Sequence, residues 1–141
     1  MVVPAISRPV RRRSGQRVGA CSLDNSFERR LAVGRWRLRE GGPRKFPDWQ
    51  ASYVDGAGGQ SVTQRMWDRM TPVADGAVTV SLGEVREAMR LMADKARVIA
   101  EGAGALALAA ALSGRAGEGP FVCIVSGGNI DLEKFCELVA R

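Results

Sequence analysis

Residues 123–135 read CIVSGGNIDLEKF, which places an apolar run directly before a hydroxyl group and two glycines. The run from Phe121 to Val125 is apolar throughout, as in strands buried inside parallel sheets. Asp131 to Val139 has apolar residues at helical spacing and predicts an amphipathic helix. Glycines between a strand and a helix let a ligand approach the backbone, and ligands of open α/β sheets bind at this end of the strands. The alternative is an ordinary turn in which Asn129 or Asp131 caps the helix.

Upstream of this turn, a strand and a helix are predicted with a clear boundary between them. Ala77 to Val80 predicts the strand, and Ser81 and Glu84 form a capping-box sequence that begins the helix. The helix has one apolar stripe, formed by Val85, Ala88, Met89, Met92 and Ala96.

Two further helices complete the pattern. Ser61 to Met70 predicts a short helix that ends before Pro72, because the residue before a proline avoids the helical region. Gly104 to Leu112 is apolar all round and predicts a buried helix, which Gly114 and Gly117 end. Over residues 77–141 the order is strand, helix, helix, strand, helix, which indicates an α/β fold.

The first 50 residues differ in charge from the remainder of the chain. The 141 residues have a net charge of +6, and residues 1–50 hold 12 Lys and Arg against 4 Asp and Glu. Residues 51–141 hold 9 against 11. Clustered arginines such as Arg11-Arg12-Arg13 suit phosphate groups. No nucleic-acid-binding motif accompanies them, so we favour a solvated basic stretch over nucleic-acid binding.

Local signals in this basic segment are weak. Val2 to Ala5 reads as a short strand and turn, and Arg17 to Cys21 as a short buried strand. Ser26 to Val33 predicts a helix, and Arg35 to Gln50 reads as a long loop. We therefore divide the chain into a basic, divergent segment over residues 1–50 and a domain portion over residues 51–141.

Missing residue types exclude several kinds of chemistry. The chain has no histidine, which excludes a Ser-His-Asp triad and a histidine-based zinc site. Cys21, Cys123 and Cys136 show no metal-binding spacing and predict reduced, mostly buried thiols in a cytoplasmic protein. The longest apolar stretch, Ala103 to Leu112, is too short to span a bilayer, so no membrane association is expected.

Two glycine-rich stretches carry carboxylates. Glu101 directly precedes Gly102 and the buried helix, where a carboxylate is favourable for the helix alone. In the functional interpretation, Glu101 lies at the floor of a pocket. Asp55 and Gly56 begin the sequence DGAGG, which is either a surface turn or an anion-binding loop.

The three stretches together are more specific than any one of them. In order, YVDGAGGQSV, VSLGEVREAMRLMADKARVIAEGAGALALAAAL and CIVSGGNIDLEKF resemble the C-terminal part of pyridoxal-phosphate-dependent threonine/serine dehydratases. These enzymes belong to the fold type II group, which includes serine racemase and the tryptophan synthase β-subunit. The resemblance covers residues 51–141 and extends more faintly to MVVPA and RVGACSLD, which are similar to two core strands of the family.

The resemblance implies roles for six residues. Ser126 matches the serine whose hydroxyl meets the pyridine nitrogen of the cofactor, and Gly127 and Gly128 let the ring edge lie against the turn. Glu101 matches a glutamate near the cofactor ring. Asp55 and Gly56 match a loop on the substrate side.

Other parts of the family pattern have no counterpart. The Schiff-base lysine lies in an upstream motif, and Lys45, Lys95 and Lys134 all lack its context, so no catalytic residue is assigned. The four-glycine phosphate loop should follow VVPA, where Ile6-Ser7-Arg8-Pro9 stands instead. Ser22 falls where some members have an acidic metal ligand, so no metal site is assigned. These absences leave open whether the chain is itself an enzyme.

The resemblance implies a partial three-layer parallel-sheet domain of the fold type II enzymes, incomplete at its N-terminal side. We expect a fragment or remnant of a threonine/serine ammonia-lyase that uses pyridoxal 5'-phosphate and is inactive alone. Its expected partners are a hydroxy amino acid in the intact enzyme, and a complementing N-terminal half or a second copy of the chain. The alternative is a non-catalytic interaction module that acts through the basic residues 1–50.

Overall fold

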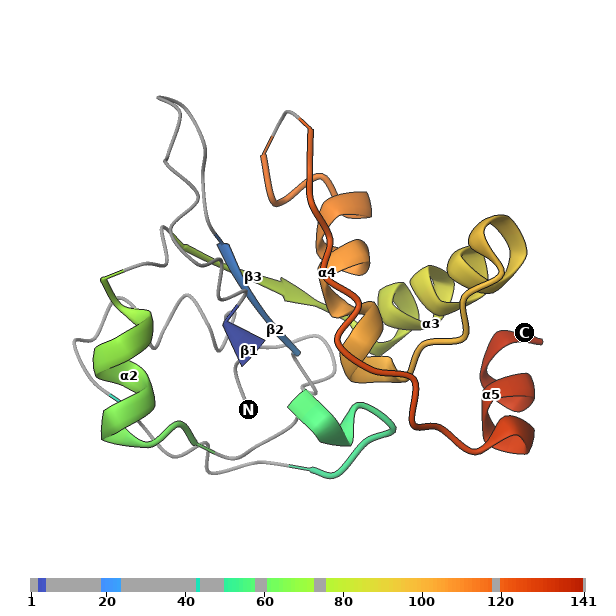
Figure 1. Ribbon diagram of the computed structural model, residues 1–141, viewed down its shortest axis with the longest axis horizontal. Helices are drawn as coiled ribbons and strands as arrows, with labels where there is room; N and C mark the ends of the chain where they lie inside the picture. Colours follow the sequence, from blue (N-terminus) through green and yellow to red (C-terminus); the bar gives the residue numbers. More distant parts are fainter. Residues whose placement is uncertain are drawn as a thin grey trace.

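The computed structural model describes residues 3–4, 19–23, 43, 50–57, 61–72, 76–117 and 120–140 (Figure 1). Its strands are β1 (Val3–Pro4), β2 (Gly19–Leu23) and β3 (Gly76–Val80). Its helices are η1 (Asp55–Ala57), α2 (Gln64–Met70), α3 (Leu82–Leu91), η2 (Met92–Ala96), α4 (Gly102–Leu112) and α5 (Leu132–Val139). The predicted helix over Ser26 to Val33 and most of the predicted loop over Arg35 to Gln50 lie outside the described residues.

The described strands form a small mixed sheet in the order β1-β2-β3. β2 and β3 run parallel, with Gly19 opposite Gly76 and Leu23 opposite Val80. β1 runs antiparallel to β2, so the described sheet is mixed. In Figure 1 the strands lie between α2 on the left and α3 with α4 on the right.

A single apolar core joins β3, α3, α4 and α5. Val80 of β3, Met89 of α3, Leu106 of α4 and Phe135 of α5 belong to one cluster of buried side chains. Seven residues of α4 are buried, as predicted, but Leu112 at its end is exposed. Within the described ranges, no helix has the length and apolar character needed to cross a bilayer.

The start of α3 confirms the predicted capping box. The Ser81 hydroxyl accepts from the Glu84 backbone N–H at 3.3 Å, and the Glu84 carboxylate accepts from the Ser81 backbone N–H at 2.7 Å. Val85, Ala88, Met89 and Met92 of the predicted stripe are buried. Ala96 is exposed, because η2 is a π-helical turn whose wider winding rotates it off the stripe. This part of the prediction was wrong.

The segment Phe121–Val125 departs from the prediction more seriously. It is neither strand nor helix, and Ser126 therefore does not follow a strand. A strand needs a neighbour to satisfy its backbone groups, and no described strand pairs with this segment. Instead the segment runs beside α4, where the Cys123 thiol lies 3.6 Å from the Ala107 carbonyl oxygen (Figure 1). Val122 is 94% exposed as a result.

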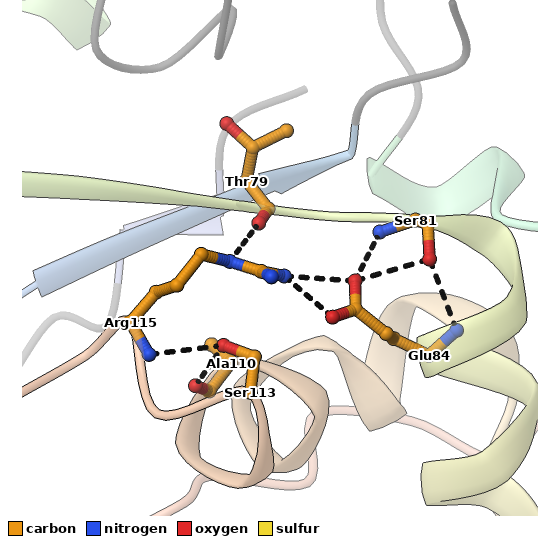
Figure 2. A network of polar contacts seen from close by, with 6 residues as sticks. All are labelled: Thr79, Ser81, Glu84, Ala110, Ser113 and Arg115. Atoms are coloured by element: carbon orange, nitrogen blue, oxygen red, sulfur yellow. Dashed lines mark hydrogen bonds and ion pairs between the residues drawn. The ribbon is translucent and has the colours of Figure 1, made fainter. Parts of the chain in front are cut away.

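A polar clamp joins the end of α4 to the boundary between β3 and α3 (Figure 2). The Arg115 guanidinium donates to both carboxylate oxygens of Glu84, at 2.7 and 2.8 Å, and to the Thr79 carbonyl oxygen at 3.1 Å. Gly114 and Gly117 on either side of Arg115 have φ of 71° and 100°, which favours glycine. The loop that they shape therefore returns Arg115 to the capping box.

The clamp also sets the charge state of Glu84. Burial, the largest influence, raises the pKa of its carboxyl, but hydrogen bonds from Ser81 and Arg115 and the charge of Arg115 outweigh burial. The pKa therefore lies below its usual value of 4.5. The carboxylate consequently stabilises the fold above that value, and this contribution is lost as the pH falls through the lowered folded pKa.

We predict that the isolated chain self-associates through its exposed apolar segment. Val122 and Ile124 are 94% and 49% exposed, in a run without charge or proline that has high strand propensity. Sedimentation velocity should show oligomers for the wild type and a shift toward monomer for Val122→Lys/Ile124→Lys. A monodisperse wild-type monomer that unfolds cooperatively would contradict this prediction.

We predict that Arg115→Ala lowers the free energy of unfolding by about 1 kcal/mol, because it breaks an ion pair between Nη2 and both Glu84 carboxylate oxygens and a hydrogen bond to the Thr79 carbonyl oxygen. The control is Arg90→Ala, which breaks the 2.8 Å pair with Glu87, whose partners are both 56% exposed. That change should cost less than about 0.5 kcal/mol. Urea denaturation in the Val122→Lys/Ile124→Lys background measures both values, and equal losses would show that the clamp has no special role.

Candidate functional site

Three stretches that are distant in sequence meet at Glu101, which is the N-cap residue of α4. The Glu101 backbone N–H donates to the Gly127 carbonyl oxygen at 3.2 Å. The Glu101 carboxylate lies directly against Gly127, and it is 3.5 Å from the position of a Cβ atom built on Gly56. The structure therefore brings Gly56, Glu101 and Gly127 of the predicted site together.

The glycines of the Ser126–Gly128 turn are explained by this packing. A Cβ atom on Gly127 would overlap the Glu101 carboxylate, and one on Gly104 would overlap the Gly127 carbonyl oxygen. A Cβ atom on Gly128 would lie 2.6 Å from the Ile99 carbonyl oxygen. The absence of side chains thus lets the turn lie on the first turn of α4.

Ser126 is the group that this turn presents to solvent. The residue is exposed, and its hydroxyl has no hydrogen-bond partner among the described residues. Asn129 is exposed as well, whereas Asp131 is the N-cap of α5 and accepts from the backbone N–H groups of Glu133 and Lys134. The capping role therefore belongs to Asp131, one of the two predicted candidates.

The Asp55–Ala57 turn is anchored by the buried residue that precedes it. Val54, directly before it, is fully buried, and the Ala57 backbone N–H donates to the Val54 carbonyl oxygen at 3.4 Å. Asp55 is exposed and accepts from the Gly56 backbone N–H at 2.7 Å. Gly58 and Gly59 lie outside the described residues. The described part of this stretch is a one-turn helix with an exposed carboxylate.

The two lysines in the described ranges lie away from this site. Lys95 is exposed, and its ammonium group lies 2.7 Å from the Asp94 carboxylate. Lys134 is exposed on α5, and Lys45 lies outside the described residues. Across the described ranges, no group of three or more His, Cys, Asp or Glu side chains could hold a metal ion.

The thiols are more accessible than the sequence predicted. Cys123 is half-buried, and burial raises the pKa of its thiol. Cys136 is exposed, because it follows the buried Phe135 and points about 100° away around α5. The side chain of Cys21 lies outside the described residues. The prediction of a buried thiol was therefore wrong for Cys136.

Two residues that hold this site were not identified from the sequence. Gly104 contacts Gly127, and Tyr53 packs on Gly102 at the start of α4. The sequence does offer one signal, since Gly102 and Gly104 stand in a helix of strong helix formers, where each glycine costs stability. Such glycines indicate a close approach of another backbone or ring.

We predict that Gly104→Ala destabilises the chain by about 1 to 3 kcal/mol, because the Gly127 backbone must move away from α4. Gly83→Ala is the control, since a Cβ atom there lies 3.9 Å from the Ser81 hydroxyl and meets nothing else within 4 Å. The control should be neutral or stabilising by a few tenths of a kcal/mol. Urea denaturation distinguishes the two, and a neutral Gly104→Ala would refute the close contact.

Comparison with known proteins places the sequence in one family. The family model described as pyridoxal-phosphate dependent enzyme matches residues 25–127. The catabolic L-threonine dehydratase TdcB of Escherichia coli (strain K12) is 41% identical over 70 residues, which are 47% of this chain and 21% of that protein. The protein of the same name from Staphylococcus aureus (strain N315) is 35% identical over 89 residues, 60% of this chain and 26% of that protein.

Solved structures of similar fold include enzymes with related names. A threonine deaminase from the organism abbreviated T.th. has a TM-score of 0.65 at 29% identity and covers 70% of this chain. Threonine deaminase isoform 2 of Solanum lycopersicum, in its processed form, also has a TM-score of 0.65, at 25% identity, and covers 75% of this chain. The chain spans 33% and 32% of these two structures. It therefore corresponds to between about a fifth and a third of these four proteins.

Pyridoxal phosphate is the cofactor of this family. The described residues suit the pyridine-nitrogen edge of this cofactor. The exposed Ser126 hydroxyl can form a hydrogen bond with a ring nitrogen, and Gly127 and Gly128 beside it have no side chains that would block the ring. The described residues do not supply a buried amine, since Lys95 and Lys134 are both exposed. The predicted resemblance and the predicted fold type II class are confirmed by the matched relatives. The chain belongs to the pyridoxal-phosphate-dependent enzyme family.

Proposed function

We propose that this chain forms the pyridine-nitrogen side of the cofactor site of a threonine/serine ammonia-lyase. The observation that carries the proposal is the position of Ser126. Its hydroxyl is exposed and has no hydrogen-bond partner among the described residues, and Ser126 directly precedes Gly127 in the chain. Gly127 is fixed against Glu101, and Glu101 is close to Gly56. The six residues assigned through the family resemblance thus belong to stretches that meet at one helix terminus.

The proposed reaction is β-elimination. L-Threonine loses its hydroxyl group as water and its amino group as ammonia after hydrolysis, which leaves 2-oxobutanoate, and L-serine leaves pyruvate in the same way. Pyridoxal phosphate, when bound, supplies the electron sink that makes removal of the α-proton feasible. The threonine dehydratases and deaminases among the relatives support the choice of substrate class.

Ser126 would tune this chemistry through its hydroxyl. A serine hydroxyl is neutral and both donates and accepts one hydrogen bond, unlike a carboxylate, which favours a protonated ring nitrogen. A largely unprotonated ring withdraws electrons more weakly, which suits loss of water from the β-carbon. Glu101 would hold the backbone of the Ser126–Gly128 turn in place through its own backbone N–H.

The remaining groups of the site would come from the upstream part of a dehydratase. Lys95 and Lys134 are exposed, whereas a lysine that forms covalent bonds at neutral pH needs burial or a nearby cation to lower its pKa. A partner that carries the upstream part of a dehydratase would bring that lysine and a phosphate-binding loop. The alternative interaction module over residues 1–50 falls almost entirely outside the described residues.

We predict that the chain alone releases no ammonia from threonine or serine. Added pyridoxal phosphate should give only the weak absorbance change that surface lysines produce with free aldehydes. A coupled ammonia assay and absorbance spectra of the full chain measure both. Turnover by the chain alone, abolished by replacing Lys45, Lys95 or Lys134, would overturn the proposal.

Co-expression with the upstream part of a catabolic threonine dehydratase should restore turnover. In the complemented enzyme, Ser126→Ala should lower kcat/KM by about tenfold or more, the cost of one lost hydrogen bond to a reacting group. Lys95→Ala should leave kcat/KM unchanged, because its ammonium group pairs with Asp94 in solvent. Equal effects of the two changes would refute the role of Ser126.

A further inference from the structure

Tyr53, the only tyrosine in the chain, joins two helices at the site. Its hydroxyl donates to the carbonyl oxygen of Leu82, the first residue of α3. Its ring lies on Gly102, the first residue of α4, where a Cβ atom would be 2.9 Å from Cδ2 and 3.1 Å from Cε2 of the ring. One side chain therefore fixes the distance between the starts of the two helices.

The turn with Asp55 and Gly56 begins immediately after this anchor. Val54 packs on the same glycine as Tyr53, since its Cγ2 atom would lie 2.8 Å from a Cβ atom on Gly102. On the far side of the turn, a Cβ atom on Gly56 would lie 3.1 Å from the Ala103 Cβ atom and 3.5 Å from the Glu101 carboxylate. A shift of Tyr53 would consequently move Gly56 relative to Glu101.

The state of the phenol suits this role. Burial raises the pKa of Tyr53 above its usual value of 10.0, while the charge and hydrogen bonds of the neighbouring Arg86 act in the opposite direction. The hydroxyl is therefore protonated at neutral pH and remains a donor to the Leu82 carbonyl oxygen.

We propose that Tyr53 is a positioning residue, which fixes the Asp55–Gly56 turn against Glu101 by linking that turn to the first residues of α3 and α4. The consequence for catalysis rests on the proposed function, because the substrate-side position of this turn is part of that proposal. The consequence for local structure does not depend on it.

The structural test is amide hydrogen exchange of the full chain, followed at Gly56 and Ala57. Tyr53→Phe keeps the ring on Gly102 and removes the hydroxyl, which is the donor to the Leu82 carbonyl oxygen and a contact of Arg86. It should speed exchange at these two amides by about tenfold. Thr71→Val is the matched control, because the Thr71 hydroxyl donates to the helical carbonyl oxygen of Trp67 at 2.8 Å. It should leave both amides unchanged.

Gly102→Ala provides a second way to disturb the same contact, because its Cβ atom must displace the Tyr53 ring or Val54. Gly102→Ala should also speed exchange at Gly56 and Ala57. If Tyr53→Phe does not fold, this variant tests the positioning role of Tyr53 in its place. Unchanged exchange in a folded Tyr53→Phe or Gly102→Ala chain would overturn the proposal, as would the same change in Thr71→Val.

The catalytic test uses the complemented enzyme. Tyr53→Phe should raise KM for the amino acid by about three- to tenfold with kcat changed less than about twofold, because a displaced turn weakens ground-state and transition-state binding alike. A purely structural role would lower the active fraction, and hence kcat, without raising KM. If the wild-type chain does not complement, the proposed function fails while the exchange result still decides the positioning role.

Discussion

The hydrogen bond from the Glu101 backbone N–H to the Gly127 carbonyl oxygen fixes the geometry of the site. The Ser126–Gly128 turn follows a segment that pairs with none of the described strands, so the described sheet does not determine where this turn lies. The first turn of α4 takes that role instead. Gly104 gives the Gly127 carbonyl oxygen room to approach, and Gly127 gives the Glu101 carboxylate room in return. Replacing either glycine would separate two of the three stretches.

The elements that are encoded by local signals were predictable from the sequence. The capping box at Ser81 and Glu84, the N-cap at Asp131 and the end of α4 at Gly114 each depend on residues a few positions apart. The segment Phe121–Val125 was not predictable in this way. Its apolar, β-branched sequence suits a strand, but a strand also needs a neighbour, and periodicity carries no information about whether that neighbour is present.

The site was predictable only in part for the same reason. The family resemblance identified Asp55, Glu101 and Ser126 from the order of their motifs, and the structure brings these stretches together. The contacts that hold them, of Gly104 with Gly127 and of Tyr53 with Gly102, link positions far apart in sequence. A single sequence marks such contacts only by a glycine in an unfavourable place, and it does not identify the partner. The cofactor-binding roles themselves remain a proposal.

The convergence of the Asp55–Gly56 turn with the start of α4 is tested most directly by disulfide trapping. A Cβ atom on Gly56 would lie 3.1 Å from the Ala103 Cβ atom, a few tenths of an ångström short of the spacing of about 3.5–4.5 Å in disulfides. In a chain whose native cysteines are replaced by serine, Gly56→Cys/Ala103→Cys should form an intramolecular disulfide on mild oxidation, detected by mass spectrometry. Gly83→Cys/Ala103→Cys should not, since a Cβ atom on Gly83 meets only the Ser81 hydroxyl within 4 Å. Failure of the first pair to close, or equal closure of both pairs, would contradict the arrangement.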